Sequence, residues 1–375
     1  GGENLANASG NAYLAGRYDV TMGNRSQCHA HFIYCTRMEK INRMVDFIRQ
    51  SPGLSSSTTN AESIDAETLT QCIRAAYNLG SAVRLRRGPC STAEIYYVDL
   101  PGSDGLIAKV YQHLNPPPLD LLILLRDQGA PLAAPIPTRM NELVCSIPGA
   151  REACMVLSHR AHGRPLRVDP KDAGALGSAL ARLHIAADTL SCDAVPVLPH
   201  FDVSHLLDLP VAKISPFLEA VPKEHNRFAA IAVELRKKLI AMSQISPDFG
   251  VCHGDAHYLN AHFDSARGVT LFDFDEVNRG FRAYDIGTAL WGTLGRGGTP
   301  DVWNAIIERY NQVRPLSNRE AETITTFMAV RQIWWMGFHA RTWGRYRLPW
   351  LDDAFFIRSL DLLNQITVEA CGIEE

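Results

Sequence analysis

The sequence has little of what marks several large classes of protein. It contains no run of about 20 apolar residues, the length that a membrane-spanning helix needs, and no series typical of a signal peptide. Its nine cysteines are odd in number and never form a CxxC pair, which argues against a disulfide framework and a zinc ribbon. A formal charge of −3 gives no general attraction for nucleic acid or for an anionic membrane. We therefore expect a cytoplasmic protein with neither of these partners.

The chain is long enough for two lobes, and its pattern divides them near residue 160. Of its 375 residues, 46% are hydrophobic and 21% are charged, which is the composition of a folded globular protein. Residues 1–62 are expected to be an arm and linker, because the stretch SPGLSSSTTNAES that ends them is rich in Ser and Thr and has no apolar face to bury. In this interpretation residues 63–160 form the first lobe and residues 161–375 form the second.

The first lobe is predicted to hold an antiparallel sheet and two helices, the second of which comes before the last strands. A helix begins at Asp65 and is ended by Gly80. Strand-like runs lie on both sides of a turn at 88–91, and another follows over 105–111. A Leu-rich helix then starts at Pro116–Pro118, and the lobe ends with the strand-like run EACMVLSHRA.

The second lobe is predicted to be larger and mainly helical. Asp169 followed by Pro170 is typical of a helix start, with a side-chain cap and then proline in the first turn. Two strand pieces, at 261–263 and 269–274, interrupt the helical pattern. The expected fold class is α+β, with a small antiparallel-sheet lobe, a helical lobe and a ligand-binding cleft between them.

The stretch VCHGDAHYLNAHFDSARGVTLFDFDEV, residues 251–277, concentrates polar side chains of two possible chemistries. His253, Asp255 and His257 form HxDxH, and on a strand these three side chains would share one face and could bind a divalent metal. Such a metal-dependent hydrolase site needs further ligands, of which His262 is the only obvious one. This alternative therefore explains less of the stretch than the next.

Phosphoryl transfer explains more of the same residues. It requires a carboxylate to orient the attacking hydroxyl, oxygen ligands for magnesium, and a cation on the nucleotide phosphates. Asp255 and Asn260 have the D-x-x-x-x-N spacing of a kinase catalytic loop, and Asp273 begins Asp-Phe-Asp at a predicted strand end. Lys109, at a strand end in GLIAKVY, supplies the cation.

The motifs HGDAHYLN and LFDFDEVNRGFRAYDIG resemble those of the aminoglycoside phosphotransferase and choline kinase superfamily, whose members have a two-lobed protein-kinase-like fold. The resemblance extends to ALGSALARLH before them and to the segment 313–341 after them, and it covers roughly residues 65–365. The last segment is most similar to the bacterial stress-response kinase and homoserine-kinase-like subgroups.

This resemblance implies the use of ATP and Mg²⁺ and assigns a role to each residue of the motifs. It implies a catalytic base at Asp255, magnesium ligands at Asn260 and Asp273, a contact to the α and β phosphates at Lys109, and a brace for the catalytic loop at His253 and Asp285. By the same resemblance, Asp275 is either a further metal ligand or, as we favour, a solvated or capping carboxylate.

On the side of the first lobe the resemblance implies three further contacts. Adenine would bond to backbone groups near Leu157 to His159, and the turn from Gly88 to Thr92, with the Ser91 hydroxyl, would cover the phosphates. The lysine of kinase-like folds pairs with an acid from the next helix, where Asp120 is the best-placed candidate. Glu94 is a substitute, and the absence of any pair would indicate weak activity.

The predicted function is ATP- and magnesium-dependent transfer of the γ-phosphate to an alcohol. The acceptor is a small molecule, such as an amino alcohol, a homoserine-like metabolite or an antibiotic, or a protein Ser/Thr hydroxyl. Several arginines within residues 301–375 argue against polycationic aminoglycosides, and the tryptophans there are expected to be core rather than acceptor-binding. The alternatives are a pseudokinase-like nucleotide-binding scaffold and the metal-dependent hydrolase.

Overall fold

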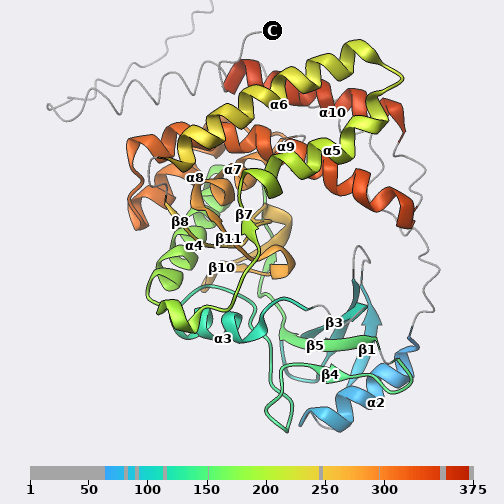
Figure 1. Cartoon of the computed structure of the whole chain (residues 1–375). Helices are drawn as coiled ribbons and strands as arrows, with labels where there is room; N and C mark the ends of the chain where they lie inside the picture. Colours follow the sequence, from blue (N-terminus) through green and yellow to red (C-terminus); the bar gives the residue numbers. More distant parts are fainter. Residues whose placement is uncertain are drawn as a thin grey trace, which may run out of the picture.

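The structure is a computed structural model. It describes residues 64–79, 83–88, 93–112, 116–150, 152–244, 248–294, 296–346 and 352–370. The arm and linker predicted for residues 1–62 lie outside the described residues. Figure 1 shows a β-sheet with helix α2 at the lower right and a larger, mainly helical part above it. The two-lobed α+β architecture expected from the sequence is therefore confirmed.

The small lobe, or N-lobe, is built on a five-stranded antiparallel sheet with the strand order β1-β2-β3-β5-β4. Its strands are β1 Arg84–Arg87, β2 Glu94–Asp99, β3 Leu106–Gln112, β4 Cys145–Ser146 and β5 Ala153–His159. Helix α2, Ala66–Ala76, begins where the sequence predicts, because the Asp65 side chain accepts a hydrogen bond from the Thr68 N–H. Its buried residues form one core with the sheet face that includes Val110.

The opposite face of this sheet joins the core of the large lobe. Helix α3, Leu119–Asp127, buries its leucines in the same cluster as Tyr111 and Val156. The helix ends close to Gly129, whose φ of +87° suits a residue without a side chain. Because successive side chains of a strand alternate between faces, β3 presents Val110 to α2 and Tyr111 to the large lobe.

The large lobe, or C-lobe, is mainly helical. Its α-helices are α4 Pro170–Asp188, α5 Leu209–Ile214, α6 Pro222–Ser243, α7 Arg282–Trp291, α8 Pro300–Val313, α9 Asn318–Tyr346 and α10 Asp353–Gln365. Short 3₁₀ or π turns are η2 Cys192–Ala194, η3 Ser204–Asp208, η4 Ser215–Leu218, η5 Tyr258–Asn260, η6 Phe274–Glu276 and η7 Ile366–Ala370. Helix α4 begins at the predicted cap, since the Asp169 side chain accepts from the Asp172 N–H.

Two small sheets lie among these helices and carry the loops of the site. One has the order β10-β9-β6 and the other β7-β11-β8. Their strands are β6 Arg164–Pro165, β7 His200–Phe201, β8 Phe249–Cys252, β9 Ala261–Asp264, β10 Gly268–Leu271 and β11 Asn278–Phe281. Strands β6, β7, β8 and β11 were not predicted from the sequence. The last predicted strand was too long, because β10 ends at Leu271 and Asp273 takes a left-handed φ of +66°.

No helix among the described residues has the length and apolar character required to span a bilayer.

Candidate active site

The loop between β8 and β9 is held in place by a buried carboxylate. Asp285, on α7, accepts hydrogen bonds from the backbone N–H groups of His253 at 2.7 Å and Gly254 at 2.9 Å. His184 adds its Nε2 at 3.1 Å. Burial alone would raise the pKa of Asp285, but the hydrogen bonds from the His184 side chain and the His253 backbone hold that pKa below its ordinary value. A buried, ionised Asp285 thus fixes the start of the loop.

The imidazole of His253 also has a structural role. Its Nε2 lies 3.0 Å from the Phe272 carbonyl oxygen, and its Nδ1 accepts from the Asp255 N–H at 3.3 Å. This pattern corresponds to a neutral ring with the proton on Nε2. The ring packs on Phe274, with 4.3 Å between centroids. His253 therefore connects the loop that carries Asp255 to the loop that carries Asp273.

Asp255 and Asn260 face each other within the loop between β8 and β9. The Asn260 Nδ2 donates to the Asp255 carbonyl and to its Oδ2, each at 3.0 Å. His257 places its Nε2 at 3.4 Å from the Asp255 Oδ1, and burial lowers the pKa of this histidine. The D-x-x-x-x-N spacing thus brings the predicted carboxylate and amide into direct contact.

The sequence analysis did not single out Arg331, which contacts Asp255 directly. This arginine of α9 is buried, at 2% exposure, and its Nη2 donates to the Asp255 Oδ1. Its guanidinium lies 5.0 Å from the ring of Trp291 and 4.5 Å from that of Trp334. An arginine within the apolar run TFMAVRQIWWMGF was the available signal, because an arginine on a buried helix face needs an anionic partner.

These contacts control the charge of Asp255. Burial alone would raise the pKa of its carboxyl, but the positive charge of Arg331 and the hydrogen bond from Asn260 lower that pKa to about 2. The carboxylate is ionised at neutral pH. Glu276, one turn after Asp273, responds in the opposite direction, since burial and the charge of Asp255 raise its pKa to about 6.

Lys109 extends from β3 of the N-lobe to two carboxylates of the C-lobe. Its Nζ lies 2.6 Å from the Asp273 Oδ1 and 2.6 Å from the Asp275 Oδ2. Burial alone would lower the pKa of this amine, but the two carboxylates raise it, so the ammonium is retained. Asp275 also accepts from the Tyr111 hydroxyl at 2.9 Å. The expectation that Asp275 is merely solvated or capping is therefore wrong.

The two acids proposed as partners of Lys109 lie elsewhere. Asp120 is exposed on α3 and makes no ion pair with Lys109 within the described part of the chain. Glu94 stands opposite Val110 in the sheet register, whereas Lys109 stands opposite Ile95. Because strand side chains alternate, Glu94 points to the α2 face, where it accepts from the Tyr96 hydroxyl at 2.9 Å. The prediction that Asp120 or Glu94 pairs with Lys109 is therefore wrong, since the partners are Asp273 and Asp275.

The side chains of Asn260 and Asp273 fit a hard divalent cation. Asn260 uses its Nδ2 on Asp255, which leaves its amide oxygen without a hydrogen bond among the described residues. Asp273 uses Oδ1 on Lys109 and keeps Oδ2. An amide oxygen and a carboxylate oxygen are ligands of the kind that magnesium takes.

Two backbone groups of the predicted adenine-binding segment are used within the protein. The Leu157 carbonyl accepts from the Ile136 N–H at 2.7 Å, and the His159 N–H donates to the Ala134 carbonyl at 3.0 Å. The prediction of adenine contacts near Leu157 to His159 therefore rests on the other backbone groups of this segment.

Gly88, the first residue of the predicted phosphate-covering turn, directly follows β1. The Gly88 N–H donates to the Ile95 carbonyl at 2.7 Å, so this residue closes the hairpin between β1 and β2. Ser91 and Thr92, the other predicted contacts of this turn, lie outside the described residues.

The HxDxH interpretation is not supported by the geometry. In the described ranges, the group of side chains arranged closely enough to hold a metal is His184, Cys252 and Asp285, not the three residues of HxDxH. His253 and Asp255 lie in a loop after β8 rather than on a strand. The alternation on which this interpretation depended is therefore absent there.

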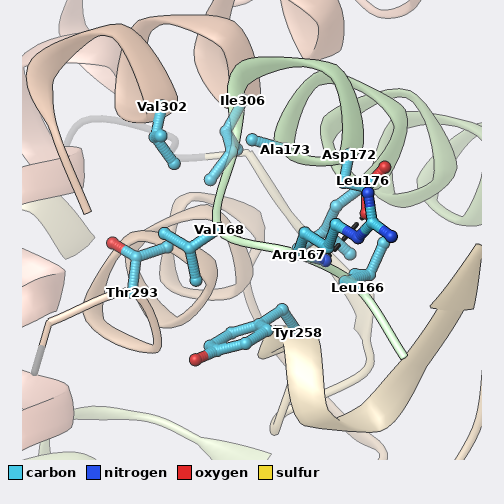
Figure 2. A pocket seen from close by; sticks show the side chains of 10 residues that line it. All are labelled: Leu166, Arg167, Val168, Asp172, Ala173, Leu176, Tyr258, Thr293, Val302 and Ile306. Carbon is cyan, nitrogen blue, oxygen red and sulfur yellow. Dashed lines mark hydrogen bonds between the residues drawn. The ribbon is translucent and has the colours of Figure 1, made fainter. Parts of the chain in front are cut away.

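Figure 2 shows a pocket bordered by helices α4 and α8 and by η5. It is lined by Leu166, Arg167, Val168, Asp172, Ala173, Leu176, Tyr258, Thr293, Val302 and Ile306. None of the predicted site residues is in this set, and Tyr258 of η5 is its link to the loop. The dashed line in Figure 2 is the bond from the Arg167 N–H to Asp172, 2.7 Å long, which fixes the entry to α4.

Two lobes joined at a lysine and a set of carboxylates form a kinase-like architecture, and comparison with known proteins gives the family. Residues 95–321, more than half of the chain, match the model of the family described as "Phosphotransferase enzyme family". The chain belongs to this family and is a kinase-type phosphotransferase.

Two relatives of similar sequence are uncharacterized proteins. The chain is 33% identical to one from Deinococcus radiodurans over 207 residues, which are 54% of this chain and 59% of that protein. It is 26% identical to one from Synechocystis over 340 residues, which are 87% of this chain and 94% of that protein. The chain thus spans about three fifths of the first relative and nearly all of the second.

Solved structures confirm the fold. The amicoumacin kinase hAmiN, in complex with AMP-PNP, Ca²⁺ and Ami, has a TM-score of 0.63 at 15% identity and covers 80% of this chain and 94% of its own. A microcompartment-associated aminopropanol kinase has a TM-score of 0.64 at 20% identity, and the match covers 80% of this chain and 95% of that protein. Spectinomycin phosphotransferase, with ADP and spectinomycin, has a TM-score of 0.60 at 16% identity, covering 83% and 98%.

Proposed function

We propose that this protein transfers the γ-phosphate of ATP, with magnesium, to the hydroxyl group of a small molecule. The observation that carries the proposal is the contact of the N-lobe amine of Lys109 with Asp273 of the C-lobe at 2.6 Å. In phosphoryl transfer, a lysine and a metal-binding carboxylate must reach one polyphosphate from the two lobes. The direct contact of Asp255 with Asn260 supports the other half of this site.

The residues divide the chemistry between them. Asp255, ionised by its surroundings, would accept the proton of the acceptor hydroxyl as its oxygen bonds to the γ-phosphorus and the bond to the ADP oxygen breaks. Lys109 would neutralise the phosphates of the nucleotide. Asn260 and Asp273 would hold magnesium, which supplies positive charge to the transferring group when bound. His253 and Asp285 keep the loop in position.

A small-molecule alcohol is the acceptor class that we favour. Solved proteins of this fold include kinases named for amicoumacin and for aminopropanol, which are small molecules. The buried Arg331 pairs with Asp255 and offsets its negative charge, so this part of the site is not strongly anionic. This charge balance favours a neutral or singly charged acceptor over a polycation.

The test is a screen for acceptor-dependent ATP consumption. Purified protein with ATP and Mg²⁺ would be incubated with panels of amino alcohols, hydroxy amino acids, sugars, antibiotics and a generic protein substrate. We expect one small-molecule class to stimulate ADP release and to yield a phosphorylated product by mass spectrometry. Phosphorylation of the protein substrate alone would contradict the proposed acceptor class.

Replacing the proposed base separates catalysis from binding. In Asp255→Ala we expect transfer to fall by at least about 10²-fold, because the acceptor hydroxyl loses the group that orients it and takes its proton. The affinity for MgATP, measured by isothermal titration calorimetry, should change less than about threefold. Asp202→Ala, in the loop before η3, is a matched surface control. Transfer at the wild-type rate in Asp255→Ala would remove Asp255 from its role.

A further inference from the structure

The ammonium of Lys109 has two carboxylate partners, whereas the sequence predicted one. A lysine has three N–H donors. Two of them point to Asp273 and Asp275, each at 2.6 Å, and its side chain is only 15% exposed. The remaining donor is the one that a nucleotide phosphate can use. The orientation of this donor is therefore set by the two carboxylates.

The two carboxylates differ in the other groups that they bind. Asp273 is the residue proposed to bind magnesium, so its charge is shared with a metal when the nucleotide is present. Asp275 has a second hydrogen bond of its own, from the Tyr111 hydroxyl at 2.9 Å. Tyr111 lies two residues after Lys109 on the same face of β3, and the Lys109 Nζ is 5.2 Å from its ring. Lys109, Tyr111 and Asp275 thus form one closed cluster.

We propose that Asp275 is the positioning residue for Lys109, in the place that an acid of the next helix takes in other kinase-like folds. This inference rests on the proposed function. The two N-lobe acids that the sequence predicted as partners do not pair with the lysine, since Asp120 is exposed on α3 and Glu94 is on the other face of the sheet. Asp275 reaches it from η6 of the C-lobe, 166 residues further along the chain.

This arrangement has a mechanical consequence. Where the partner of the lysine comes from a helix of the N-lobe, the lysine is oriented within one lobe. Here its partner belongs to the other lobe, so the lysine is oriented only while the two lobes are in contact. Nucleotide affinity and closure of the cleft therefore depend on the same ion pair.

The first experiment measures MgATP affinity by isothermal titration calorimetry on the full chain. Asp275→Asn keeps the shape but removes the charge, and we expect about 10-fold weaker binding. Asp275→Glu restores the charge and should recover part of this loss. Tyr111→Phe removes only the supporting bond and should cost about threefold. Asp99→Asn, which breaks an exposed N-lobe ion pair with Arg86, is the matched control and should bind as the wild type does.

The second experiment is a double-mutant cycle with Lys109→Met. If Asp275 acts through Lys109, the double variant should bind MgATP no more than about twofold more weakly than Lys109→Met alone. A purely structural role of Asp275 would instead add its full effect in both backgrounds. Additive losses would overturn the inference, as would wild-type affinity in Asp275→Asn combined with a loss in Asp120→Asn.

Magnesium titrations test the remaining explanation, that Asp275 is a metal ligand rather than the partner of Lys109. Asp273→Ala should raise the Mg²⁺ concentration needed for half-maximal ATP binding, whereas Asp275→Asn should leave it unchanged. A shift of this concentration in Asp275→Asn equal to that in Asp273→Ala would make Asp275 a metal ligand and overturn its assignment to Lys109. A wild-type protein that binds no MgATP would remove the proposed function, and this inference with it.

Discussion

The carboxylate of Asp255 illustrates how single residues set the chemistry of this site. Arg331 donates to its Oδ1 and Asn260 to its Oδ2, and the His257 Nε2 lies 3.4 Å from Oδ1. Partial burial would favour the protonated acid, but the adjacent guanidinium reverses this preference. The result is a weak base in a fixed orientation. In phosphoryl transfer, orientation of the hydroxyl contributes more than basicity, because the transition state is loose.

Arg331 should therefore be required for turnover more than for nucleotide binding. In Arg331→Met the Asp255 carboxylate loses its fixed partner, and we expect kcat to fall by about 10²-fold with the MgATP affinity changed less than about threefold. Arg331→Lys keeps the charge but not the planar group and should recover only part of the rate. The measurement is transfer to the acceptor found in the screen, with calorimetric MgATP binding alongside.

Arg341 provides the matched control for this experiment. It is an exposed arginine of the same helix, α9, and lies over the ring of Phe338. Arg341→Met should retain the wild-type kcat. Equal losses of kcat in the Arg331 and Arg341 variants would contradict a specific role for the buried arginine.

Glu276 should make stability depend on pH. Its pKa in the folded protein is about 6, against 4.5 for an unperturbed glutamate, so the folded state binds this proton more tightly than the unfolded state. The cost of its buried charge is fully present above pH 6 and is relieved as the pH falls toward 4.5. Glu276→Gln should thus raise the free energy of unfolding at pH 7.5 by about 1–2 kcal/mol, and this gain should vanish near pH 4.5.

The measurement is denaturant unfolding of both proteins at pH 4.5, 6 and 7.5. Since glutamine does not titrate, the difference between variant and wild type isolates Glu276 from the other acids. A difference of the same size at all three pH values would show that Glu276 does not carry this charge penalty.

At the scale of elements, close helix packing depends on particular glycines. Helix α4 packs against α8, and a Cβ on Gly177 would lie 2.1 Å from the Ile306 carbonyl oxygen. A Cβ on Gly174, one turn earlier, would instead meet the Arg309 side chain at 2.8 Å. The backbone of α8 cannot move away without shifting the helix, whereas the arginine side chain can.

These two glycines therefore allow a matched comparison. Gly177→Ala should destabilise the protein by about 2 kcal/mol or more, because the helix pair must separate. Gly174→Ala should be neutral or stabilising by up to about 1 kcal/mol, because alanine favours a helix and the obstacle is flexible. Thermal and denaturant unfolding would check both. Equal effects of the two substitutions would show that contact with the α8 backbone is not what matters.

Residues with left-handed φ values shape the two loops that carry the sequence motifs. Gly254 has a φ of +82°, and a Cβ there would come within 2.0 Å of the Glu276 carbonyl oxygen. Asp273 takes a φ of +66° without being glycine, which turns the chain from β10 into η6. The two loops that carry Asp255 and Asp273 are in this way packed directly on one another.

At the scale of the whole molecule, a network of ion pairs holds the C-lobe behind the site. Arg282 of α7 donates to Asp188 at 2.5 Å, and Arg314 after α8 donates to Asp248 at 2.5 Å. Arg282 also reaches Asp248 at 3.4 Å, so the four groups are connected. The network ties the ends of α4 and α8 to the strand that leads into the catalytic loop.

The sequence by itself determined the capped helix starts, the antiparallel sheet of the N-lobe and the order of the motifs. Helix starts at Asp65 and Asp169 were predictable because capping is a local effect, and the antiparallel sheet followed from turns and alternation. The D-x-x-x-x-N spacing brought Asp255 to Asn260 because five residues of one loop can close only a short distance. Such features depend on neighbours in the chain.

The tertiary structure alone decided which distant side chains meet. Arg331 reaches Asp255 from 76 residues away, and Asp275 reaches Lys109 across 166 residues. Local pattern gave Lys109 the wrong partners, because which face of a strand and which lobe an acid belongs to depends on how the lobes pack. Long-range ion pairs are selected by burial, since a charge removed from water must find whichever opposite charge the fold brings within reach.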